Sequence, residues 1–100
     1  MSTLRIYVPR DEIADFCRRN GIRRLAIFGS AIRDDFTPKS DVDVLVEFEP
    51  GRTPGFAFVS LERELGTLLR RRVDLNTPQS LSKYFRDEVL REAESIYDAA

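Results

Sequence analysis

The sequence predicts one α/β domain in which a small β-sheet is flanked by helices. Along its 100 residues, segments with apolar positions spaced by three and four residues alternate with short apolar or β-branched runs. The first pattern is typical of a helix with one buried face, and the second is typical of a buried strand. The resulting order is helix, strand, helix, strand, helix, strand, helix, which is the order of an α/β domain built on a small sheet.

The first half of the chain contains the clearest strand signal. Residues 42–48, Val-Asp-Val-Leu-Val-Glu-Phe, are rich in β-branched side chains and largely alternate with polar ones. A helix over residues 10–20 is indicated by Ile13, Phe16 and Cys17, which share one face. The other elements expected here are a strand over 25–28, a helical turn over 31–33 and a loop over 34–40, with Gly21 ending the first helix.

The second half is expected to continue with a turn over residues 49–55, a helix over 56–69 and a strand over 72–75. In that strand, Val73 and Leu75 flank an acid, and apolar residues on both sides suggest a central strand.

A final helix is expected over residues 81–98. It rests on the helical spacing of four apolar residues: Phe85, Val89, Ala93 and Ile96. Of these, Phe85 and Ile96 are expected in the core, while Tyr84 and Tyr97 fit either the core or an interface.

The composition excludes several classes of protein. The chain has 16 Lys and Arg residues, 17 Asp and Glu residues and a net charge of −1, so it has no basic footprint for nucleic acid. No apolar stretch approaches the ~20 residues that cross a bilayer, and no apolar signal segment opens the chain. With one Cys and no His, a zinc site, a Cys–His pair and an internal disulfide are excluded. These features predict a cytoplasmic protein with Cys17 in its core.

Two carboxylates at the start of the 42–48 strand are the first candidates for chemistry. Asp41 and Asp43 are two residues apart, and side chains alternate across a strand, so both should project from one face. Their mutual repulsion is relieved by a cation between them, and Mg²⁺ commonly lies between carboxylates and substrate phosphates. Taken alone, the pair also fits an acidic strand face exposed to water.

Gly29 and Ser30 follow the 25–28 strand and open a turn. A glycine there lets a phosphate approach the backbone closely, and the hydroxyl of Ser30 adds a hydrogen-bond donor. Arg33 would share a face with Ser30 if the turn is helical.

Two residues near the 72–75 strand are weaker candidates. Asp74 is either a functional acid or an ordinary exposed strand residue. The basic run 70–72 is most simply the solvated end of a helix, where cations also favour the helix dipole, and Arg72 is a minor candidate for phosphate binding.

Taken together, Gly29-Ser30, ten intervening residues and Asp41-Val42-Asp43 resemble the signature of the polymerase-β-like nucleotidyltransferase superfamily. The wider strings 28–33 and 39–48 are similar to its small stand-alone members, the minimal nucleotidyltransferase domains. Asp74, within Arg-Arg-Val-Asp-Leu, matches the later strand that carries the third acid of that family. The resemblance implies the nucleotidyltransferase fold, a small mixed β-sheet flanked by helices, with residues 1–100 as a single minimal domain.

The resemblance also implies a nucleoside triphosphate bound with Mg²⁺ over the sheet. Gly29, Ser30 and Arg33 would bind its phosphates. The implied catalytic residues and ligands of two metal ions are Asp41, Asp43 and Asp74. Asp74 would also assist deprotonation of the attacking hydroxyl, and two cations would stabilise the attacking and leaving oxygens.

Stand-alone members of this family resemble antitoxins that inhibit HEPN-domain toxins by transferring AMP to a tyrosine. Only about 25 residues follow Asp74, so we expect substrate recognition to come from a partner. The resemblance therefore implies protein adenylylation with ATP as donor and a HEPN toxin as partner, with no membrane or direct nucleic-acid role. Two alternatives stay open: a non-catalytic module that inhibits its partner by occlusion, and an enzyme that modifies a small molecule such as an antibiotic.

Overall fold

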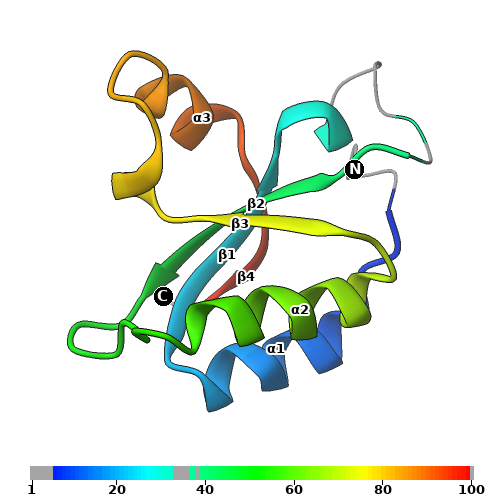
Figure 1. The fold of residues 1–100 in the computed structure, drawn as a ribbon, viewed down its shortest axis with the longest axis vertical. Helices are drawn as coiled ribbons and strands as arrows, with labels where there is room; N and C mark the ends of the chain where they lie inside the picture. Colours follow the sequence, from blue (N-terminus) through cyan, green and yellow to red (C-terminus); the bar gives the residue numbers. More distant parts are fainter. Residues whose placement is uncertain (1–5, 33–36, 38, 100) are drawn as a thin grey trace.

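The sheet is mixed and has helices on both sides (Figure 1). The computed structural model describes residues 6–32, 37 and 39–99. Within these residues, four strands lie in the order β3-β2-β1-β4: β1, Ile22–Phe28; β2, Val42–Phe48; β3, Val73–Asn76; and β4, Glu94–Asp98. β1 is antiparallel to both of its neighbours, β2 and β4, whereas β2 and β3 are parallel. The predicted fold class is therefore confirmed.

Two helices cover one face of the sheet and form the main core (Figure 1). They are α1, Arg10–Arg19, and α2, Phe58–Leu69. Their buried residues follow the helical spacing of the sequence: Ile13, Phe16, Cys17, Leu61, Leu65 and Leu69. The sheet contributes Val42, Val44 and Val46 to the same core, and all three are fully buried.

Cys17 is one of the core residues, as the sequence predicts. Its side chain is fully buried, and burial raises the pKa of its thiol to about 12, because the apolar surroundings disfavour the thiolate. The thiolate is the reactive form of cysteine, so this position is chemically inert near neutral pH.

The C-terminal end of α2 has an uncommon backbone. The amide of Arg71 donates to the carbonyl of Gly66 at 3.1 Å, and the amide of Arg70 donates to the carbonyl of Thr67 at 3.3 Å. These are the two hydrogen bonds of a Schellman motif, whose left-handed residue is usually glycine. Here that residue is Arg70, with φ of 58°, and no other non-glycine residue of the described chain has a positive φ.

A smaller apolar group lies on the opposite face of the sheet. It joins Ala26 and Leu45 to Leu81 and to the apolar side of α3, Arg86–Glu92. Figure 1 shows α3 on the side of the sheet away from α1 and α2. No helix among the described residues has the length and apolar character needed to cross a lipid bilayer.

The expected final helix over residues 81–98 is wrong. α3 ends at Glu92, the backbone becomes extended at Ala93, and β4 then pairs with the outer edge of β1. Val89 and Ala93 contact the smaller apolar group, whereas Ile96 is buried in the main core on the other face. The helical spacing was misleading because these residues serve two different sides of the sheet.

Phe85 also departs from the prediction, since 45% of its surface is exposed and it is not a core residue. Ile96 is in the core as predicted, Tyr84 is 89% exposed, and Tyr97 packs partly buried against the main core.

β3 is an edge strand of the sheet, not the central strand that Val73 and Leu75 suggested. Both residues are buried because they belong to the core under the two helices. The apolar residues on either side of Asp74 therefore indicate only that one face of the strand is covered. They do not show whether the strand has a neighbouring strand on each edge. Asp74, between them, is exposed on the other face.

Candidate active site

The acidic residues share the sheet face that α1 and α2 do not cover. Asp43 lies opposite Asp74 in the parallel pair of β2 and β3 and opposite Phe28 in the antiparallel pair of β2 and β1. Opposite residues of neighbouring strands project from the same face, and the strands are about 4.8 Å apart. Because Val42 and Val44 are buried in the core below, Asp43 and Asp74 project from the other side, which we call the acid face.

Asp41 extends this arrangement to the start of the sheet. It directly precedes β2, and the amide of Val42 donates to the carbonyl of Arg72 at 2.9 Å. Asp41 and Arg72 are therefore neighbours, as Asp43 and Asp74 are two residues further along. Asp41 is exposed and Asp43 is partly buried. On the acid face, Asp41 and Asp43 thus lie in one row, and Arg72 and Asp74 lie in the neighbouring row.

Gly29 brings the turn after β1 against Asp43. It begins a short 3-10 helix, η1, Gly29–Ile32, two residues earlier than the helical turn that the sequence predicts over 31–33. Its φ is +74°, and a Cβ on it would overlap Oδ2 of Asp43 and lie 3.1 Å from its Cγ. Only glycine fits both the backbone angle and the space. Ser30 is partly buried in the same turn, and Arg33 lies outside the described residues.

A hollow of about 280 Å³ opens beside Gly29 and Asp43. Its walls come from the sheet and from the region of α3, and its lining residues are Phe28, Gly29, Asp43, Phe85, Glu88, Val89 and Glu92. We call it the aromatic hollow. No sequence motif singled out Phe85, Glu88 or Glu92 as lining residues. The spacing of Glu88 and Glu92 by four residues on a helix was a usable signal that they share a face.

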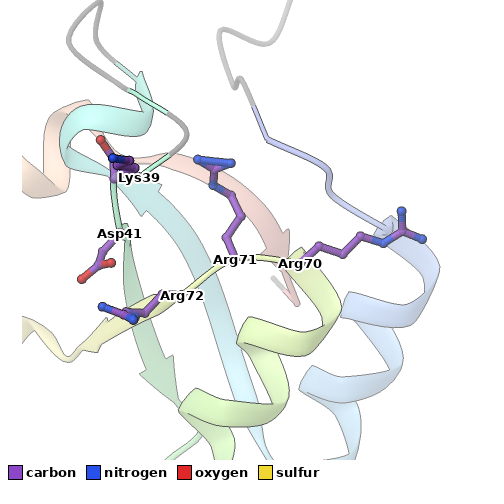
Figure 2. A pocket seen from close by; sticks show the side chains of 6 residues that line it. Lys39, Asp41, Arg70, Arg71 and Arg72 are labelled. Carbon is purple, nitrogen blue, oxygen red and sulfur yellow. The ribbon is translucent and has the colours of Figure 1, made fainter.

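A second hollow, of about 440 Å³, lies at Asp41, where the segment before β2 meets the end of α2 (Figure 2). Its lining residues are Lys39, Ser40, Asp41, Arg70, Arg71 and Arg72, and we call it the basic hollow. The structure therefore brings Asp43 to the aromatic hollow and Asp41 to the basic hollow.

The donor atoms of the acid face suit a hard divalent cation. They are carboxylate oxygens, which Mg²⁺ prefers. In the described part of the chain, no group of three or more Asp, Glu or Cys side chains is arranged to hold a metal ion. Mg²⁺ is usually bound by one or two carboxylates together with substrate phosphates. Asp43 and Asp74 on neighbouring strands meet that lesser requirement.

A small mixed sheet that carries aspartates beside a glycine turn suits an enzyme that transfers phosphorus-containing groups, because carboxylates can hold a divalent ion and the glycine lets a phosphate approach the backbone. The chain belongs to the polymerase beta nucleotidyltransferase family, whose sequence pattern it matches over residues 11–100. The domain is thus a nucleotidyltransferase, as the resemblance of its motifs implied.

Two relatives cover most of the chain. Protein adenylyltransferase MntA of Thermococcus cleftensis is 43% identical over 75 residues, which are 74% of this chain and 74% of that protein. A Methanocaldococcus jannaschii protein, MJ0435, which is provisionally named a protein adenylyltransferase, is 36% identical over 85 residues, 85% of this chain and 90% of its own length.

Solved structures share the fold. One that is provisionally described as a minimal nucleotidyltransferase is 39% identical, with a TM-score of 0.69 over 84% of this chain and 85% of its own. A toxin–antitoxin complex with AMP-PNP superimposes with a TM-score of 0.71 at 22% identity, over 91% of this chain and 74% of its own. A complex of tri-AMPylated Shewanella oneidensis HEPN toxin with an MNT antitoxin gives a TM-score of 0.62 at 22% identity, over 89% and 69% of the two chains.

Proposed function

We propose that this protein is a Mg²⁺-dependent antitoxin that transfers AMP from ATP to a tyrosine hydroxyl of a HEPN-domain toxin. The observation that carries the proposal is the close approach of the Gly29 backbone to the carboxylate of Asp43. A phosphate bound at the turn would lie directly beside an acid of the acid face. The relatives named protein adenylyltransferase and the HEPN toxin complex support the acceptor and the partner.

ATP fits the two surfaces that meet at Gly29. The turn of Gly29 and Ser30, together with Arg33, would bind the β- and γ-phosphates, because a glycine leaves room for them and the serine hydroxyl can donate a hydrogen bond. The aromatic hollow would receive the nucleoside, since Phe28 and Phe85 offer apolar ring surface next to Asp43.

The proposed reaction is a single in-line displacement. The tyrosine oxygen attacks the α-phosphorus of ATP, the bond from that phosphorus to the oxygen bridging the β-phosphate breaks, and pyrophosphate leaves with the electron pair. Asp74 would accept the hydroxyl proton. AMP is then joined to the tyrosine oxygen, and most of the rate enhancement comes from positioning and charge stabilisation.

Asp41 and Asp43, with Asp74 beside them, would hold the divalent ions. When bound, Mg²⁺ neutralises the charge that develops on the phosphate oxygens. With such ions bound, Asp41 and Asp43 would hold the α-phosphate over the sheet, and Asp74 on β3 would be the proton acceptor one strand away.

The proposal is tested by incubating the protein with α-³²P-labelled ATP, Mg²⁺ and the purified HEPN partner. We expect label on the partner. Asp43→Asn should abolish transfer while leaving the fold intact, since the amide keeps the size of the side chain and removes a ligand charge. Asp41→Asn should behave similarly, and Asp74→Asn should slow transfer with less effect on ATP binding.

The matched control is Asp11→Asn, an exposed acid of α1 on the opposite layer, which should transfer AMP normally. Inhibition of the toxin without label on it would favour occlusion as the mechanism. Label on an added aminoglycoside in the absence of the partner would favour modification of a small molecule.

A further inference from the structure

The basic hollow is a local concentration of positive charge in a nearly neutral chain. Four of its lining residues are cationic, and one, Asp41, is acidic, whereas the whole chain has a net charge of −1. It lies where the segment before β2 meets the segment joining α2 to β3 (Figure 2). The proposed binding of ATP at Gly29 uses none of these cations.

Two of the four cations hold the walls of the basic hollow in place. The guanidinium of Arg71 donates to the carbonyl of Thr37 at 3.0 Å, which ties the end of α2 to the segment before β2. The guanidinium of Arg70 lies 4.3 Å from the centre of the Tyr7 ring, a cation–π distance. In Figure 2, Arg70 points away from Asp41 and towards the N-terminal segment.

The other two cations are available to a ligand. Lys39 and Arg72 are exposed, and neither side chain forms a hydrogen bond or ion pair with another residue of the described chain. Arg72 neighbours Asp41 through the bond from the Val42 amide to the Arg72 carbonyl. Figure 2 shows the side chains of Asp41 and Arg72 side by side at the start of the two strands.

We propose that the basic hollow is a second phosphate-binding subsite, which binds a phosphate ester carried by the acceptor. This inference rests on the proposed function. Arg72 is the central ligand, because a guanidinium matches two oxygens of a phosphate with parallel hydrogen bonds. Lys39 adds a point charge from the opposite wall.

The order of the strands separates this phosphate from those of the donor. The turn of Gly29 and Ser30 follows β1, on one side of β2, whereas the basic hollow lies on the β3 side. A nucleotidyl transfer has two participants that can carry phosphate, the donor and the acceptor. The subsite on the β3 side therefore selects an acceptor that bears a phosphate ester near its reactive hydroxyl, such as an acceptor that already carries AMP.

The test measures binding of three small probes to the full chain at one fixed low ionic strength: tyrosine, adenylyl-tyrosine and inorganic pyrophosphate. We expect adenylyl-tyrosine to bind more tightly than tyrosine. Arg72→Gln and Lys39→Gln should each weaken adenylyl-tyrosine about tenfold, the usual effect of removing a charged hydrogen bond. The control is Arg18→Gln, an exposed arginine of α1, which should leave all affinities unchanged.

Equal binding of adenylyl-tyrosine by Arg72→Gln and the unmodified protein would overturn the proposal. So would a loss confined to pyrophosphate, because the subsite would then hold free phosphate and not the acceptor. Transfer of labelled AMP to the HEPN partner is measured in parallel. If AMP is transferred but Arg72→Gln does not change the binding of adenylyl-tyrosine, the subsite alone is refuted. If Arg72→Gln weakens that binding but no AMP is transferred, the proposed function alone is refuted.

Discussion

Gly29 is the residue at which backbone geometry and the proposed chemistry coincide most closely. Its positive φ and the carboxylate of Asp43 next to its Cα both exclude a side chain. Gly51 offers a useful comparison, because its φ is +78° and nothing lies within 4 Å of the position of a Cβ.

Gly29→Ala should therefore reduce both stability and AMP transfer. The left-handed backbone alone costs an alanine about 1–2 kcal/mol, and the overlap with Asp43 must also displace the carboxylate. A displacement of that kind can lower the rate of a positioned reaction about 100-fold. Gly51→Ala, measured by thermal unfolding and labelled transfer, should lose similar backbone stability and keep its activity. Equal activity of the two variants would contradict the role of the contact with Asp43.

Cys17 predicts an alkaline loss of stability. Burial raises the pKa of its thiol from 9.0 to about 12, so between these pH values the unfolded chain has released a proton that the folded chain still holds. The contribution is complete below pH 9, and the free energy of unfolding falls as the pH rises towards 12. Denaturant titrations across this pH range should show a shallower decline for Cys17→Ala. Parallel declines would contradict the burial of the thiol.

At the scale of elements, the end of α2 keeps a left-handed arginine where glycine is the common residue. Arg70→Gly and Arg70→Ala both remove the contact with Tyr7, and only the glycine variant relieves the strained φ. We expect Arg70→Gly to be more stable than Arg70→Ala by about 1 kcal/mol, measured by urea unfolding. Equal stabilities would show that the backbone at this position relaxes freely.

α3 supplies the wall of the aromatic hollow, and the residue before it, Phe85, tests that assignment. Phe85→Ala should weaken ATP binding at least about fivefold, since base–aromatic stacking is worth about 1–3 kcal/mol. Stability should change little because the ring is partly exposed. Tyr84→Ala is the control, since Tyr84 is 89% exposed and is not a lining residue. Calorimetric titration of ATP distinguishes the two variants, and an equal affinity in both would place the nucleoside elsewhere.

The elements differ in how well the sequence predicted them. α1 and β2 agree almost residue for residue, because a single amphipathic face and a dense β-branched run each have one structural solution. β4 was missed because its alternating pattern is only five residues long and continues the helical spacing of α3. β4 forms because it pairs with β1, which is distant in the sequence, and local periodicity cannot predict such a long-range contact.

The candidate site was predicted as a set of motifs, and its geometry was not. Alternation in β2 correctly placed Asp41 and Asp43 opposite the buried valines, because it follows from backbone geometry. The register that sets Asp74 beside Asp43 depends on which strands are neighbours. The two hollows depend on side chains from segments far apart in sequence, so neither Phe85 nor the grouping of Lys39 with Arg72 was foreseeable.

At the scale of the whole molecule, ATP binding should couple to folding. A ligand at 100 times its Kd adds about 2.7 kcal/mol to the free energy of unfolding, which in a domain of this size raises the Tm by roughly 10 °C or more. We expect this shift with ATP and Mg²⁺ and its loss on addition of EDTA, as followed by thermal unfolding. A shift that survives the chelator would contradict the dependence on a divalent ion.

The position of β3 at the rim of the sheet has a consequence for the size of the acceptor. Asp74 lies on the edge strand β3 and is exposed to water, whereas Asp43 on the inner strand β2 is partly buried. A side chain that protrudes from another folded protein can approach such a border without any parting of the strands. The proposed reaction would thus accommodate a bulky macromolecular acceptor without separation of the strands.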